Sequence, residues 1–127
     1  MEIVGVGSQI LEVARVRHLL ERHADAFLAR VFTAEERAAC GDRVHAAEHY
    51  AAVWAAKEAT LRSLGLSWHR GIAWADVAVQ SGGSGPPRLH VSGGVGEAAA
   101  TLRVTGWHVT TAHCRSYATA TVIATRG

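Results

Sequence analysis

Apolar residues recur with helical spacing in three parts of the chain. Over residues 10–23 they fall three or four positions apart, as on one helix face, and a shorter stretch of the same kind covers residues 26–31. Residues 46–64 are the clearest case, because they are rich in alanine, contain no proline and are followed by glycine. Thr33 and Glu36 have the spacing of a capping box, which predicts another helix start.

Elsewhere, polar and apolar residues alternate or form short apolar runs, which is typical of strands. Glycines and prolines over residues 82–87 predict a turn, and residues 95–102 predict a short helix. Gly5 and Gly7 would close the first strand in a tight turn. We expect strands over residues 2–6, 74–81, 88–92, 107–113 and 117–125. The fold class is therefore α+β, with an antiparallel sheet packed on one long helix in a single domain, residues 1–127.

Composition narrows the classes of function. Apolar residues make up 49% of the 127 residues and charged residues 19%, which argues against disorder. No apolar run approaches the roughly 20 residues that span a bilayer, and the N-terminal residues lack the basic start of a secretion signal. A net charge of +2 is too small to indicate nucleic acid. Cys40 and Cys114 are far apart and lack metal-binding spacing, so we expect a reduced, cytoplasmic protein. From the apolar runs and the charge, we expect it to bind neither membrane nor nucleic acid.

Two local motifs carry candidate chemistry, and each has a plain structural alternative. His45 and His49 lie one helical turn apart and, with Glu48, form the H-x-x-E-H string of zinc proteases. A solvated helix face explains the same string, and no third ligand is identified. Lys57 and Glu58 place opposite charges in the most apolar helix. If buried, they need polar partners, a metal or an anion, and otherwise they project to water.

Four segments resemble, in order, the holo-acyl-carrier-protein synthases, which are small phosphopantetheinyl transferases. Residues 5–16 read G-V-G-S-Q-I-L-E-V-A-R-V, similar to the family pattern G-[IV]-G-x-D-[IV]-x-E-[IV]-x-R-[IFV]. Residues 54–59 read W-A-A-K-E-A, similar to an aromatic residue followed by A-A-K-E-A, and Gly65 closes this helix as in the family. The other segments are G-P-P-R-L at residues 85–89 and W-H-V-T-T-A-H at residues 107–113. The resemblance covers essentially the whole chain.

This resemblance implies a reaction and an assembly. Members of the family form homotrimers that hold coenzyme A in clefts between subunits. The serine hydroxyl of an apo carrier protein attacks the pyrophosphate of coenzyme A, the 4′-phosphopantetheine arm is transferred, and adenosine 3′,5′-bisphosphate leaves. A Mg²⁺ ion bridges the pyrophosphate and is held by an aspartate of the first motif and the glutamate of K-E-A. We therefore expect coenzyme A as substrate and an acidic acyl or peptidyl carrier protein as partner.

The matching positions give the expected site residues. Glu58 would bind Mg²⁺ and is a candidate base, Gln9 would be the second metal ligand, and Lys57 would contact phosphate or the leaving group. Arg15 and Arg22 of the first helix would bind the acidic carrier protein. The residues expected to bind coenzyme A, with the turn at residues 85–87 supplied by the adjacent subunit, are Arg62, Gly65, Gly85, Pro87 and His113.

Several positions depart from the family pattern at this site. Gln9 stands where the family has its metal-binding aspartate, and an uncharged amide is a weaker Mg²⁺ ligand. Val53 replaces an arginine, and Ala112 lacks the hydroxyl usual there. Two hypotheses follow: a divergent but active transferase, or a paralogue that binds a carrier protein or carrier-bound thioester, or acts on it with different chemistry, without phosphopantetheinyl transfer. A zinc hydrolase ranks below both.

Overall fold

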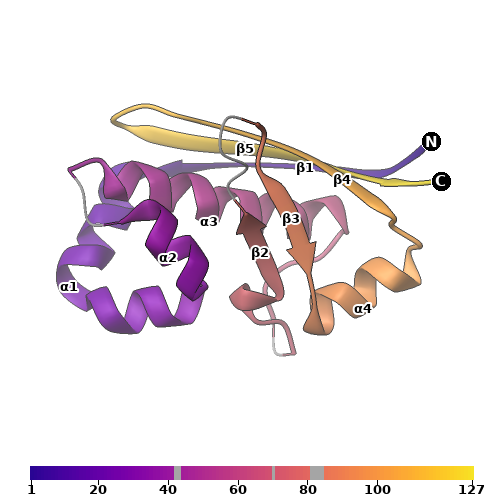
Figure 1. Cartoon of the computed structure of the whole chain (residues 1–127), viewed down its shortest axis with the longest axis horizontal. Coiled ribbons are helices and arrows are strands. Elements are labelled where there is room, and N and C mark those ends of the chain that lie inside the picture. The colour runs from indigo at the N-terminus through magenta and orange to yellow at the C-terminus, as the bar shows by residue number, and fades with distance from the viewer. Residues whose placement is uncertain (42–43, 70, 81–84) are drawn as a thin grey trace.

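Helix α3 (Ala46–Ser63) lies across one face of a three-stranded antiparallel sheet (Figure 1). The computed structural model describes residues 1–41, 44–69, 71–80 and 85–127. The sheet has the order β1–β5–β4 and consists of β1 (Glu2–Glu12), β5 (Tyr117–Arg126) and β4 (Gly106–His113). The α+β class and the antiparallel sheet on one long helix are thereby confirmed.

The remaining elements lie on the same side of the sheet as α3 (Figure 1). A second antiparallel sheet pairs β2 (Val77–Gln80) with β3 (Arg88–Val91), and the 3₁₀ turn η1 (Trp74–Asp76) precedes it. The other helices are α1 (Val13–Val31), α2 (Ala34–Cys40) and α4 (Gly93–Thr101). In the part of the chain that the structure describes, no helix has the length and apolar character needed to cross a membrane.

Small residues let α3 lie directly on β1. The helix buries a series of alanines against the sheet, and β1 offers two glycines in return. A Cβ atom on Gly5 would lie 1.9 Å from the carbonyl oxygen of Ser63, and one on Gly7 would lie 2.0 Å from that of Ala59. Because both clashes are with backbone, only glycine permits this approach. The contact fixes where the second half of β1 stands relative to α3.

The start of the chain differs from the sequence prediction. The two glycines lie inside β1 instead of in a turn, and the strand continues to Glu12, so the helix start expected at residue 10 is wrong. Ile10 is 58% exposed on the outer face of the sheet, whereas Val13 and Val16 are buried at the start of α1. The spacing of Ile10, Val13 and Val16 looks helical, but Ile10 belongs to the strand and only Val13 and Val16 belong to the helix.

Local signals predict the next two helices well. From Val13 onward, the stretches expected over residues 10–23 and 26–31 form the two parts of α1, which are separated by a kink at His23 with the non-helical angles φ −139° and ψ 35°. The capping box is confirmed: Thr33 Oγ1 accepts from the Glu36 backbone N–H at 3.1 Å, and Glu36 Oε1 accepts from the Thr33 backbone N–H at 2.8 Å. The second helix therefore begins where its sequence indicates.

The second half of the chain follows the prediction with small shifts. The strand expected over residues 74–81 begins only at Val77, because η1 occupies the residues before it. Residues 81–84, which belong to the expected strand end and turn, lie outside the described residues. Gly65 follows the end of α3 with a φ of 72°, as expected for a helix terminus. Elements are also present where expected over residues 88–92, 95–102, 107–113 and 117–125.

Candidate functional site

Gln9 and Glu58 meet where β1 passes α3. Gln9 Nε2 donates a hydrogen bond to Glu58 Oε2, and Gln9 Oε1 accepts one from the backbone N–H of Ile10 at 3.1 Å. Because a backbone N–H can only donate, the second bond fixes the amide with its oxygen toward Ile10 and its NH₂ group toward Glu58. The structure thus brings together the two residues expected to hold a metal.

Glu58 suits a Mg²⁺ ion, and Gln9 suits it only after its amide turns. Magnesium takes oxygen ligands, usually one or two carboxylates completed by water and substrate phosphates. The half-buried carboxylate of Glu58 is such a ligand. Gln9 faces that carboxylate with N–H groups, which do not bind cations. A cation at this place would therefore depend on Glu58 and on oxygens brought by a substrate.

Arg62 lies one helical turn beyond Glu58 toward the C-terminal end of α3, and Gly65 follows that end. Arg62 follows Glu58 by one helical turn, so both side chains project from the same helix face. The exposed Arg62 contributes to two shallow hollows, one of about 340 Å³ with Gln9 and one of about 220 Å³ with Glu58 and Trp68. A carboxylate and a guanidinium at an open surface can together bind a cation and an anion.

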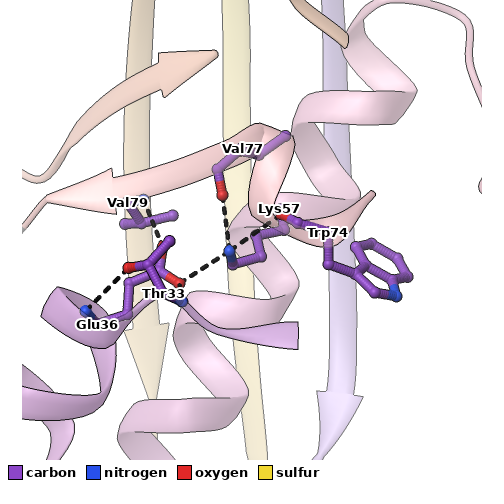
Figure 2. A network of polar contacts seen from close by, with 6 residues as sticks. All are labelled: Thr33, Glu36, Lys57, Trp74, Val77 and Val79. Atoms are coloured by element: carbon purple, nitrogen blue, oxygen red, sulfur yellow. Dashed lines mark hydrogen bonds and ion pairs between the residues drawn. The ribbon is translucent and has the colours of Figure 1, made fainter. Parts of the chain in front are cut away.

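Lys57 points into the core instead of toward this surface (Figure 2). Its ammonium lies 2.8 Å from Glu36 Oε1 and donates to the carbonyl oxygens of Val77 at 2.7 Å and Trp74 at 3.2 Å. Burial lowers the pKa of Lys57, and the bond with Glu36 opposes that effect. These three acceptors match the three N–H groups of an ammonium, so in this arrangement no N–H group of Lys57 points toward a substrate. The expected contact of Lys57 with a substrate phosphate stays a prediction.

Glu36 completes the network from α2. Its Oε2 accepts from the backbone N–H of Val79 at 2.6 Å, while its Oε1 also caps α2 through Thr33 (Figure 2). This one carboxylate therefore joins α2, α3 and β2. Sequence reasoning found Glu36 only as a cap, although the need of a buried lysine for an anionic partner was a usable signal.

Gly85, Pro87 and His113 line a different cavity, bounded by α2, α3, β2 and β4. It has a volume of about 220 Å³ and is called the histidine pocket below, because His49 and His113 both line it. The two imidazole ring centroids are 4.9 Å apart. Val53, which stands where the family has an arginine, also faces this pocket. Three residues expected to bind coenzyme A are therefore together, but not with Arg62 and Gly65.

The two groups of candidate residues lie on opposite faces of α3. His49 and Val53 line the histidine pocket, whereas Glu58 and Arg62 line the hollows near β1. An α-helix has 3.6 residues per turn, so the step from His49 to Glu58 is about two and a half turns and ends on the opposite face. One protomer therefore does not bring Glu58 and His113 into one cavity.

Glu48 lies between His45, the first histidine of the zinc-like string, and His113 of β4. Its Oε2 lies 2.7 Å from His45 Nδ1, and its Oε1 lies 3.4 Å from His113 Nδ1. The hydrogen bond from His45 lowers the pKa of Glu48 and outweighs the opposite effect of desolvation. His45 is the N-cap of α3 and not part of the helix. Among the described residues, no three His, Cys, Asp or Glu side chains are grouped to hold a metal ion, so nothing here supports zinc.

Comparison with known proteins assigns the chain to a family. A model of the 4′-phosphopantetheinyl transferase superfamily matches residues 5–122. The chain belongs to this superfamily. It is 43% identical over 104 residues to a holo-[acyl-carrier-protein] synthase of Methylobacterium radiotolerans, covering 82% of this chain and 76% of that one. It is 42% identical over 124 residues to one of Anaeromyxobacter sp. strain K, covering 95% and 94%.

A solved structure agrees with this assignment. The crystal structure of a holo-(acyl-carrier-protein) synthase from Bacillus anthracis in complex with CoA (3′,5′-ADP) is similar with a TM-score of 0.81. That match covers 100% of both chains at 25% sequence identity. The resemblance noted from four short segments is therefore confirmed across the whole fold of this superfamily member.

Arg15 and Arg22 of this superfamily member are exposed on α1. They are seven positions apart, or about two helical turns, and so lie on one face of the helix. Two guanidinium groups on one exposed face can attract an acidic protein. The structure thus leaves both residues accessible, and their contact with a carrier protein remains a prediction.

Proposed function

We propose that this protein transfers the 4′-phosphopantetheine arm of coenzyme A to a serine of an apo acyl or peptidyl carrier protein and releases adenosine 3′,5′-bisphosphate. The observation that carries the proposal is that Glu58 and Arg62 line the same open hollow on one face of α3, in a chain of the transferase superfamily. The relatives described above are named holo-ACP synthases, and none favours a paralogue without transfer activity.

In phosphoryl transfer, Arg62 would bind the pyrophosphate and Glu58 would bind a cation or accept a proton. This chemistry needs positioning and charge neutralisation more than covalent help from the protein. The Arg62 guanidinium can bind a pyrophosphate oxygen, while Glu58 can hold a cation or accept the proton of the attacking serine. Mg²⁺, when bound, supplies positive charge against the pyrophosphate. Gln9 adds no charge, so we expect the free protein to bind the cation weakly.

A coenzyme A molecule that touches both residue groups would lie between two protomers. Arg62 and His113 belong to cavities on opposite faces of α3, so the two faces must come from neighbouring subunits to enclose one ligand. The proposal therefore includes a homotrimer in which each site takes Glu58 and Arg62 from one protomer. Gly85, Pro87 and His113 would come from the next.

The outer face of the three-stranded sheet supports this assembly. Val6 and Ile10 are each 58% exposed there, and Val6 pairs with Ile123 of the central strand. The described helices and the second sheet lie on the opposite side of this sheet (Figure 1). An uncovered apolar sheet face is a liability in a monomer and suits burial against further copies of the chain.

The partner and the compartment complete the proposal. Arg15 and Arg22 would contact an acidic carrier protein and accelerate its encounter with the enzyme. Neither cysteine forms a disulfide; Cys40 is buried and Cys114 is exposed. Free thiols persist most readily where glutathione and thioredoxin keep them reduced, so we place the reaction in the cytoplasm.

Intact-protein mass spectrometry tests the proposed reaction. Apo carrier proteins from fatty-acid, polyketide and peptide synthesis are incubated with the protein, coenzyme A and Mg²⁺. At least one carrier should gain the mass of one phosphopantetheine arm, and Glu58→Gln should lower the rate by about 100-fold or more. Glu97→Gln on the exposed side of α4 is the matched control and should act like the original protein. No mass gain on any carrier would refute the proposal.

A further inference from the structure

Two tryptophans lie beside Glu58, outside the four segments that resemble the family. Trp68 and Trp74 belong to the connection between α3 and β2, and both line the hollow of about 220 Å³ that contains Glu58 and Arg62. The pair is called the tryptophan wall below. Trp68 is 45% exposed, although a large aromatic side chain is on average well buried. The transfer as described so far gives this exposed indole no role.

Contacts with two helices hold the tryptophan wall in place. The rings of Trp68 and Trp74 are stacked, with centroids 6.3 Å apart and an interplanar angle of 22°. Arg30, in the last turn of α1, places its guanidinium carbon 5.5 Å from the Trp68 ring centroid. Trp74 packs edge-on against Trp54 of α3, with centroids 6.1 Å apart, and its backbone oxygen accepts from Lys57 (Figure 2). The wall is therefore attached to both α1 and α3.

The hollow beside the wall combines apolar and charged groups. Besides the tryptophans, the described residues that line it are Glu58, Leu61, Arg62, Leu66 and Ser67. Small-molecule sites have this character, with mostly apolar walls and a few polar groups that fix the orientation of the ligand. Sites for whole ligands measure about 300–1,000 Å³, so this smaller hollow suits one segment of a ligand and not a whole coenzyme.

Two segments of coenzyme A adjoin its pyrophosphate: the nucleotide on one side and the pantoyl part of the arm on the other. With the pyrophosphate at Arg62, one of them continues into the hollow. The tryptophan wall contacts α1 through Arg30, and α1 is the helix expected to bind the carrier protein. Because the arm passes to the carrier and the nucleotide leaves, the segment on the α1 side is the arm. Its pantoyl group carries two methyl groups on one carbon, and such a branched apolar group suits an apolar wall.

We propose that Trp68 and Trp74 bind the pantoyl part of the coenzyme A arm, the branched apolar segment next to the pyrophosphate, and so hold the arm beside Glu58 for transfer. This inference rests on the proposed function, because it requires the pyrophosphate at Glu58 and Arg62. It assigns to the wall a share of the affinity for coenzyme A that does not depend on the nucleotide.

Calorimetric titration with a matched pair of ligands tests this assignment. Coenzyme A and adenosine 3′,5′-bisphosphate are titrated into the whole protein at the same Mg²⁺ concentration, and the second ligand lacks the arm. Trp68→Ala should weaken the binding of coenzyme A about tenfold, because the burial of about two methyl groups is lost. The same variant should bind adenosine 3′,5′-bisphosphate within twofold of the original protein.

Two further variants control for a disturbed structure. Trp68→Phe keeps an aromatic ring and should weaken the binding of coenzyme A by less than about threefold. Leu102→Ala, at an exposed position after α4, should bind both ligands within twofold of the original protein. A general disturbance of the connection between α3 and β2 would weaken both ligands alike, because each of them carries a phosphate for Arg62.

The outcomes separate this inference from the proposed function. If coenzyme A binds and Trp68→Ala weakens neither ligand, or both equally, the pantoyl assignment is refuted and the proposed function stands. Unchanged binding of coenzyme A with a raised KM for the apo carrier would place the carrier on the tryptophan wall, which also refutes the assignment. If the original protein binds no coenzyme A, this inference and the proposed function fail together.

Discussion

Replacing Lys57 with methionine removes the ammonium from the core and leaves Glu36 without its ion-pair partner. The two side chains are 0% and 1% exposed, and 2.8 Å separates Lys57 Nζ from Glu36 Oε1. Removing one partner of a buried pair destabilises a protein by about 3–5 kcal/mol, because the other charge stays buried. The whole free energy of unfolding of a domain is about 5–15 kcal/mol, so Lys57→Met should lose a large part of it.

Urea unfolding followed by tryptophan fluorescence measures this loss. The double variant Lys57→Met/Glu36→Gln removes both charges and keeps an acceptor oxygen for one of the two backbone N–H groups, those of Thr33 and Val79, that bond to Glu36. It should be about 2 kcal/mol more stable than Lys57→Met alone. Arg62→Met, at an exposed position of the same helix, is the matched stability control and should change the free energy of unfolding by no more than about 0.5 kcal/mol.

A different pair of results would refute this reasoning. If Lys57→Met loses less than about 1 kcal/mol of stability and still abolishes transfer, Lys57 acts on the substrate and not in the core. That outcome would favour the phosphate contact expected from the family resemblance over the network in Figure 2.

Three further predictions concern Gln9, the outer face of the sheet and Glu48. Gln9→Asp should raise the Mn²⁺ affinity of the free protein about tenfold in electron paramagnetic resonance titrations, because no amide then occupies Glu58, and unchanged affinity would contradict this. If the protein forms the proposed trimer, Val6→Glu with Ile10→Glu should convert it to monomer in sedimentation velocity, and a trimer that persists in this variant would argue against the sheet-face interface. The pKa of Glu48 is lowered on folding, so its stabilising effect is present above the ordinary glutamate pKa of about 4.3 and is lost as pH falls through the lowered value. The Tm of Glu48→Gln should therefore fall less steeply on acidification than that of the original protein, and parallel Tm curves would exclude this linkage.

Local signals in the sequence predicted the elements whose ends depend on local chemistry. The capping box at Thr33 and the glycine after α3 both mark real boundaries, because each satisfies backbone groups within one turn. The sequence prediction misplaced the junction of β1 and α1, because Ile10 is an apolar residue of the outer sheet face whereas Val13 is an apolar residue of the core. Periodicity cannot distinguish two different apolar surfaces that meet at a junction.

The site was predictable in parts. Gln9 and Glu58 were paired through the resemblance, and the close approach permitted by the β1 glycines is what places them in contact. The burial of Lys57 could not be read from its helix, since it depends on α2 and β2 folding over that face. Helical spacing alone, however, already places His49 and Glu58 on opposite faces of α3.

Subunit mixing tests most directly the central claim that this is a transferase whose site is shared between protomers. Glu58→Gln and His113→Ala chains, each weakly active alone, are co-expressed with different tags, purified as mixed trimers and assayed by carrier mass. Every mixed trimer has one of its three sites built from an intact Glu58 face and an intact His113 face, so the mixed trimers should show about a third of the original activity. Mixed trimers no more active than either variant alone would contradict the shared site.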